Sequence, residues 1–132
     1  EQGVVYKDKE AFFATSDFIS IHLKLSGRVT GLVGAEELAW MKPDACLVNT
    51  SRAPIIDEAA LIAALNTGRI GGAALDVYHR EPLQKNDPLR STPNLILTPH
   101  IGYVTRETMR VFYAETLESL KAYLSGTPIR LL

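Results

Sequence analysis

Three residues whose side chains can bind an anion and move a proton occur at regular offsets from Asp76. Arg52 lies 24 positions before Asp76, and His100 lies 24 positions after it. Glu81 follows Asp76 by five positions. A guanidinium can hold a carboxylate through two parallel hydrogen bonds, and an imidazole beside a carboxylate can serve as acid or base. The set therefore predicts a site that binds a small anionic substrate and transfers a proton.

Each of these residues follows an apolar run that predicts a β-strand. The runs cover residues 18–22, 46–49, 72–77 and 95–98. They are short and almost continuously apolar, which is typical of parallel strands covered on both faces. A weaker strand is predicted at residues 4–6. Because the carboxyl ends of parallel strands meet at one edge of a sheet, we expect Arg52, Glu81 and His100 to converge there.

Helical patterns lie between the apolar runs. One covers residues 35–41 and stops before Pro43. A second begins at its cap, Asp57, and ends at Gly68. Strand and helix alternate along the chain, so the predicted fold class is α/β, with right-handed crossovers and a parallel sheet. Residues 82–93 are interpreted as a polar surface loop.

A long helix is predicted near the end of the chain, from its cap Thr105 to about Ser125, with Gly126 ending it. Apolar residues recur along it at helical spacing, namely Met109, Phe112, Leu117, Leu120 and Leu124. The tail, residues 127–132, is also largely apolar. We therefore expect the helix and the tail to pack against another surface.

The composition narrows the classes of function. A length of 132 residues suits one domain, and a hydrophobic content of 46% is enough for a core. The net charge of −1 favours neither a nucleic acid nor a membrane surface as partner. The single Cys46, inside an apolar run, is expected to be a buried reduced thiol, which favours a cytoplasmic protein. The dispersed histidines lack metal-ligand spacing, so no metal is expected.

Taken alone, each candidate also has an ordinary structural interpretation. Arg52 can pair with a surface acid, Asp76 can cap a backbone segment, and Glu81 can be a solvated loop residue. His100 can be a structural polar residue, and His22 can either face a cofactor or cap its strand. Together, Glu81 and His100 can form a pair in which the carboxylate fixes the imidazole tautomer and favours its charged form.

The order and spacing of the motifs resemble those of the D-isomer-specific 2-hydroxyacid dehydrogenases. The resemblance covers about residues 16–130 and is carried by residues 16–23, 38–49, 73–82, Asn49-Thr50-Ser51-Arg52 and Leu97-Thr98-Pro99-His100-Ile101-Gly102. It implies a Rossmann-like, doubly wound NAD(P)-binding domain. This sequence would lack the first βαβ unit, because it holds no Gly-x-Gly-x-x-Gly loop. Residues 1–104 would form the C-terminal part of that domain, and residues 105–132 a helix and tail returning toward a substrate domain.

The resemblance also implies roles for the candidate residues. Arg52 would bind the substrate carboxylate and polarise its 2-oxo group, His100 would be the acid and base, and Glu81 would orient and charge His100. Asp76 would hold the nicotinamide carboxamide. The cofactor, NAD or NADP, would be lined by His22, Thr50, Ser51, Arg52, Asp76, His100, Ile101, Gly102 and Tyr103. The implied reaction is the reversible reduction of a small 2-oxo acid to an (R)-2-hydroxy acid by a homodimer.

Three positions depart from the family pattern: Lys24 stands in place of Pro, Ala53 in place of Gly, and Tyr103 in place of a small residue. The 132-residue chain by itself is expected to bind NAD weakly or not at all and to be inactive. Two alternatives stay open, a formate- or phosphite-type dehydrogenase and a non-catalytic, NAD-sensing corepressor. Formate-type enzymes generally carry Gln at the position of Glu81, whereas the phosphite-type enzymes and the corepressors keep the catalytic trio.

Overall fold

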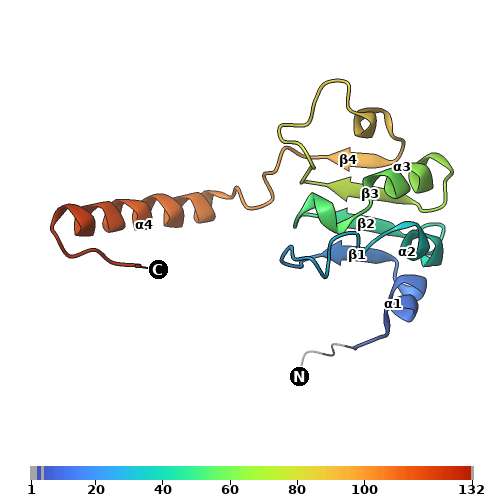
Figure 1. Cartoon of the computed structure of the whole chain (residues 1–132), viewed down its shortest axis with the longest axis horizontal. Helices are drawn as coiled ribbons and strands as arrows, with labels where there is room; N and C mark the ends of the chain where they lie inside the picture. The colour runs from blue at the N-terminus through green and yellow to red at the C-terminus, as the bar shows by residue number, and fades with distance from the viewer. Residues whose placement is uncertain (1–2, 4, 132) are drawn as a thin grey trace. The chain divides into compact units, whose positions relative to one another are not determined.

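The computed structural model describes residues 3 and 5–131, and its described residues hold a four-stranded parallel sheet. The strands are β1 (Phe18–Ile21), β2 (Cys46–Asn49), β3 (Gly72–Leu75) and β4 (Leu95–Leu97), and they lie in the order β1-β2-β3-β4 (Figure 1). The α/β fold class and all four main strands are confirmed. Three of the strands end one or two residues earlier than predicted, and β2 has the predicted bounds.

The strand register brings the four carboxyl ends level with one another. One row across the sheet holds the last residue of each strand, Ile21, Asn49, Leu75 and Leu97. The chain leaves the strands at a shared edge, through His22, Thr50, Asp76 and Thr98. The sequence predicted that the candidate residues converge at one edge of the sheet, and such convergence requires strand ends that are aligned in this way.

The described residues of the same unit hold three α-helices, α1 (Lys9–Thr15), α2 (Ala35–Trp40) and α3 (Glu58–Asn66), and two short 3-10 helices, of which the first is η1 (Ala53–Ile55). Helix α2 contacts both α1 and α3. The predicted cap of α3 is confirmed, because the Asp57 side chain accepts a hydrogen bond of 3.1 Å from the Ala60 N–H. Helix α1 was not predicted. Its cap is Asp8, whose side chain accepts from the Ala11 N–H at 2.8 Å.

The core lies between these helices and the sheet. The backbone segments before β2 and β3 also approach each other closely. Leu38 of α2, Leu47 of β2 and Leu61 of α3 are fully buried members of one cluster. Just before β3, a Cβ on Gly71 would lie 2.5 Å from the Asp44 carbonyl oxygen, so only glycine fits there without a shift of the backbone.

Three local expectations need correction. Residues 82–93 are not simply a polar loop, because they include the short 3-10 helix η2 (Pro88–Ser91), whose Leu89 is fully buried. Cys46 is a free thiol but is half-buried rather than buried. Val5 and Tyr6 are not in a strand, so the predicted strand at 4–6 is wrong for these two residues, whereas Val4 lies outside the described residues.

Residues 101–132 form a second compact unit, separate from residues 1–100. It contains the predicted long helix, α4 (Arg106–Leu124), whose cap Thr105 accepts a hydrogen bond from the Thr108 N–H at 3.1 Å. Gly126 follows in the left-handed conformation, with φ of +75°. The assignment of 105–132 to a segment that returns toward a substrate domain stays a prediction. None of the helices in the described part of the chain has the length and apolar character to span a membrane.

Candidate active site

The segment after β2 is shaped by a buried asparagine. Asn49 is 1% exposed, and its amide nitrogen donates to the Arg52 carbonyl at 3.0 Å. Its amide oxygen accepts from the Ser51 N–H, also at 3.0 Å. The Ser51 hydroxyl donates in turn to the Leu23 carbonyl, in the segment that follows β1. These bonds fix the backbone that presents Thr50, Ser51 and Arg52 at the edge of the sheet.

Asp76 is a buried carboxylate at the end of β3. It is 4% exposed, and its N–H donates to the Asn49 carbonyl at 3.0 Å, so the pairing of β2 with β3 continues by one residue. The Thr98 hydroxyl, at the end of β4, donates to Asp76 Oδ1 at 2.5 Å. Asp76 is therefore held between the ends of two neighbouring strands, which satisfies part of the hydrogen-bonding need of a buried charge.

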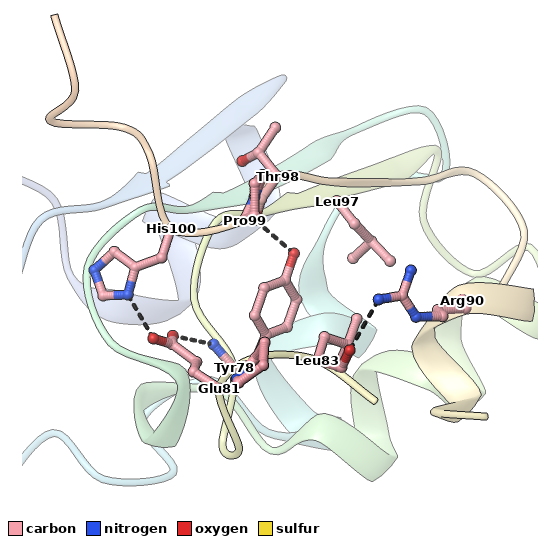
Figure 2. A pocket seen from close by; sticks show the side chains of 9 residues that line it. Tyr78, Glu81, Leu83, Arg90, Leu97, Thr98, Pro99 and His100 are labelled. Atoms are coloured by element: carbon pink, nitrogen blue, oxygen red, sulfur yellow. Dashed lines mark hydrogen bonds and ion pairs between the residues drawn. The ribbon is translucent and has the colours of Figure 1, made fainter. Parts of the chain in front are cut away.

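Glu81 and His100 form the predicted carboxylate–imidazole pair. His100 Nδ1 lies 2.7 Å from Glu81 Oε2, and the Tyr78 N–H donates to Glu81 Oε1 at 3.0 Å (Figure 2). The side chains of His100 and Glu81 are 35% and 37% exposed, so they are accessible from solvent. His100 has φ of +57°, an uncommon value for a residue with a side chain and one that concentrates at functional sites.

The charges around this pair favour an ionised carboxylate. The hydrogen bonds from His100 and from the Tyr78 N–H lower the pKa of the Glu81 carboxyl, against an opposing effect of burial, and the positive charges of His100 and Arg52 lower it further by smaller amounts. Nδ1 is the nitrogen of the His100 ring that faces this carboxylate. The Arg52 guanidinium donates to the Ser51 carbonyl at 2.7 Å, and its place beside Glu81 and His100 in a catalytic site stays a prediction.

Beside the pair lies a recess of about 630 Å³. Glu81 and His100 line one part of it, and the remaining walls come from Tyr78, Pro82, Leu83, Arg90, Leu97, Thr98 and Pro99. In Figure 2 the Tyr78 ring lies between the Glu81–His100 pair and Arg90. Arg90 donates to the carbonyl oxygens of Leu83 and Gln84, so it braces the loop after β3.

The remaining predicted cofactor residues divide into two groups. His22 follows the end of β1 at the shared edge, and its Nε2 lies 2.8 Å from the Ser20 hydroxyl on the same strand segment. Ile101, Gly102 and Tyr103 belong to the second compact unit, so their contribution to a cofactor site stays a prediction. Asn49 and Tyr78 were not predicted, although a polar residue ending an apolar strand run is a usable signal for Asn49.

Comparison with known proteins gives a consistent set of relatives. Residues 1–102 match the family model described as D-isomer specific 2-hydroxyacid dehydrogenase, NAD binding domain. The chain is 42% identical over 128 residues to D-3-phosphoglycerate dehydrogenase of Synechocystis, covering 97% of this chain and 23% of that protein. It is 43% identical over 126 residues to glyoxylate reductase of Aeropyrum pernix, covering 96% of this chain and 38% of that protein.

A solved structure shows the same fold. D-lactate dehydrogenase of Lactobacillus jensenii, determined with NAD+, superposes with a TM-score of 0.82 at 30% identity, covering 96% of this chain and 42% of that one. The chain thus spans less than half the length of each of these three relatives. The predicted Rossmann-like fold and the NAD or NADP cofactor are confirmed at the level of the family. This chain belongs to the D-isomer specific 2-hydroxyacid dehydrogenase family, and residues 1–102 match its NAD binding domain.

Proposed function

We propose that the full-length protein is an oxidoreductase that reversibly reduces a small 2-oxo acid to the (R)-2-hydroxy acid with NAD or NADP. The observation that carries this proposal is the Glu81–His100 pair at 2.7 Å, held just past the carboxyl ends of β3 and β4, while Arg52 follows the end of the neighbouring strand β2. Acting together, the guanidinium, the carboxylate and the imidazole would match the needs of a 2-oxo acid, which carries a carboxylate to be bound and an oxo oxygen to be protonated.

The residues at the strand ends suit a nicotinamide cofactor. Asp76 offers a buried carboxylate as acceptor for a carboxamide N–H, and Thr50, Ser51 and Thr98 add hydroxyl groups without bulky side chains. His22 is a further candidate at the same edge. The nicotinamide, when bound, supplies or accepts the hydride, and the protein contributes placement and electrostatics.

The chain's own residues would then have separate tasks. Arg52 holds the substrate carboxylate in a fixed orientation and draws electron density from the 2-oxo group. In the direction of reduction, protonated His100 gives the proton on Nε2 to the 2-oxo oxygen, and in the direction of oxidation the neutral ring takes it back. The Glu81 carboxylate keeps Nδ1 oriented and stabilises the positive charge of the ring in each cycle.

Glu81 also bears on the alternatives. Formate-type enzymes of this scaffold generally carry Gln at this position, so a charged carboxylate bonded to His100 favours the 2-oxo acid reaction. A phosphite-type enzyme or a non-catalytic NAD-sensing module keeps the same trio. Turnover, rather than the trio itself, separates these from the proposed function.

The test is turnover of a panel of 2-oxo acids by the full-length protein with NADH and with NADPH. His100→Ala is expected to lower kcat by about 100-fold or more, the usual scale for losing a general acid and base. His79→Ala, at an exposed histidine of the same chain, serves as the matched control and should leave kcat unchanged. Cofactor binding without turnover of any oxo acid would contradict the proposed function, and turnover of phosphite would then separate the phosphite-type enzyme from the non-catalytic alternative. Unchanged turnover in His100→Ala would remove His100 from the mechanism.

A further inference from the structure

Tyr78 links the two segments that carry Glu81 and His100. We propose that it is a positioning residue for their pair, acting through its hydroxyl group, an inference that rests on the proposed function. Tyr78 follows β3, three residues before Glu81, and its hydroxyl reaches the segment after β4 at Thr98 (Figure 2). The residue is 9% exposed, so its contacts are with the protein rather than with solvent.

The backbone and the side chain of Tyr78 reach different partners. Its N–H donates to Glu81 Oε1 at 3.0 Å, which fixes the carboxylate from the side opposite His100. Its hydroxyl lies 2.7 Å from the Thr98 carbonyl oxygen and 3.1 Å from the Leu75 carbonyl oxygen. A phenol has a single proton to donate, so the shorter contact, to Thr98, is the main bond.

The Thr98 carbonyl oxygen has a second donor, which connects Tyr78 to His100. The His100 N–H donates to this same oxygen at 3.0 Å. The peptide before Pro99 is therefore held from both sides, by the Tyr78 hydroxyl and by the His100 backbone. This peptide leads into His100, whose φ of +57° costs energy and persists only where the surrounding structure holds it. The Tyr78 hydroxyl thus helps to hold the backbone that aims the imidazole at Glu81.

The hydroxyl is also suited to remain a donor. Burial and the nearby charge of Asp76 raise the pKa of Tyr78 above its ordinary value, so the phenol keeps its proton over the range in which a dehydrogenase works. Phenylalanine at this position would preserve the ring in the core and remove only the hydroxyl, with its contacts to the Thr98 and Leu75 carbonyl oxygens. Tyr78→Phe therefore separates the proposed role of the hydroxyl from the packing role of the ring.

The experiment compares the wild type, Tyr78→Phe and Tyr113→Phe in the full-length protein. Tyr113 is 76% exposed on α4, so its substitution is a matched control for losing one phenol. With a 2-oxo acid as substrate, Tyr78→Phe is expected to lower kcat by about tenfold with KM changed less than about twofold, because the proton donor is misplaced while Arg52 is untouched. Tyr113→Phe should match the wild type in both constants.

A spectroscopic readout tests the same claim without turnover. The proton on Nδ1 of His100, identified by its absence in His100→Gln, is observed by NMR. Loosening of the Glu81 bond in Tyr78→Phe should broaden this signal or move it upfield, whereas Tyr113→Phe leaves it in place. Because this measurement does not require catalysis, it still decides the role of Tyr78 if no oxo acid is turned over and the proposed function fails.

A double-mutant cycle completes the test. If Tyr78 acts through the pair, adding Tyr78→Phe to Glu81→Gln should lower kcat by less than about threefold further, because residues acting as one unit are not additive. An unchanged Nδ1 proton signal in Tyr78→Phe would overturn the proposal, whether kcat is retained or falls. A full tenfold further loss of kcat in the Glu81→Gln background would also overturn it.

Discussion

His100 Nδ1 lies 2.7 Å from Glu81 Oε2, although the two residues are 19 positions apart and follow different strands. The contact exists because β3 and β4 pair in parallel with Leu75 opposite Leu97, so the segments after them start level. The bonds that converge on Glu81 and on the Thr98 carbonyl then bring the two side chains together. Sheet register and local hydrogen bonding, rather than sequence proximity, build the candidate acid–base pair.

Replacing Arg52 by Lys should weaken substrate binding while keeping the positive charge. Lysine cannot form the two parallel hydrogen bonds of a guanidinium with a carboxylate, so KM for a 2-oxo acid is expected to rise by about tenfold or more. Steady-state kinetics of the full-length protein measure this change. Arg28→Lys, at an exposed arginine, is the control and should retain the wild-type KM. An unaltered KM in Arg52→Lys would argue that Arg52 does not contact the substrate.

Asn49→Ala should affect substrate binding indirectly, because Asn49 supports the loop that carries Arg52. The substitution removes two half-buried hydrogen bonds, from the Ser51 N–H and to the Arg52 carbonyl, and we expect it to cost about 1–3 kcal/mol in stability. We also expect a higher KM, because the loop carrying Arg52 loses its support. Denaturant unfolding and steady-state kinetics test the two effects. A stability loss without any change in KM would limit Asn49 to a structural role.

Gly71→Ala is expected to destabilise the protein by about 1–3 kcal/mol, since the new methyl group would overlap the Asp44 backbone. Unfolding by denaturant at neutral pH measures the loss. The control is Gly27→Ala, where an added Cβ meets nothing within 4 Å, and its effect should stay within about 0.5 kcal/mol. Equal effects at the two glycines would contradict the close approach seen before β3.

The stability contributed by Glu37 should depend on pH. Burial raises the pKa of this carboxyl, but hydrogen bonds from Lys9 and from the Gly34 N–H outweigh it and lower the pKa below the ordinary value of 4.5. A lowered pKa in the folded state means that the contribution is complete above about pH 4.5 and is lost as the pH falls through the folded value.

Glu37→Gln should therefore cost about 1–3 kcal/mol at pH 7, and the difference from the wild type should shrink in acid. Unfolding curves at several pH values measure this difference. Glu36→Gln alters the exposed neighbouring residue and should show little effect at any pH. A Glu37→Gln difference that is constant from pH 7 to acid would contradict the ionised, hydrogen-bonded carboxylate.

Much of the fold could be predicted because the apolar runs are short, continuous and regularly spaced. The run at 46–49 is bounded by Pro43 and by polar residues after Asn49, which explains why β2 was placed correctly. Helix α1 has only seven residues and mixes charged with aromatic side chains, so it gives no clear periodicity. Leu89 in the loop after β3 was missed because its burial comes from a distant contact with the core.

The sequence indicated which residues are candidates for the site, but not the hydrogen bonds that hold their backbone in place. Polar residues after apolar strands indicated Arg52, Asp76, Glu81 and His100, since parallel strands end at one edge. The bonds of Asn49 and Tyr78 join side chains to backbone carbonyls of other segments, and no spacing rule reports such contacts. The left-handed backbone of His100 is likewise invisible in the sequence, because glycine or asparagine is the usual sign of that conformation.

The central claim is that the strand ends bring Arg52, Glu81 and His100 onto one oxo acid. The most direct test is a crystal structure of the full-length protein with nicotinamide cofactor and oxamate, an unreactive 2-oxo acid analogue. We predict that the Arg52 guanidinium contacts the oxamate carboxylate and that His100 Nε2 lies within hydrogen-bond distance of its oxo oxygen, with Glu81 still on Nδ1. Oxamate bound with His100 or Arg52 directed away from it would contradict the account.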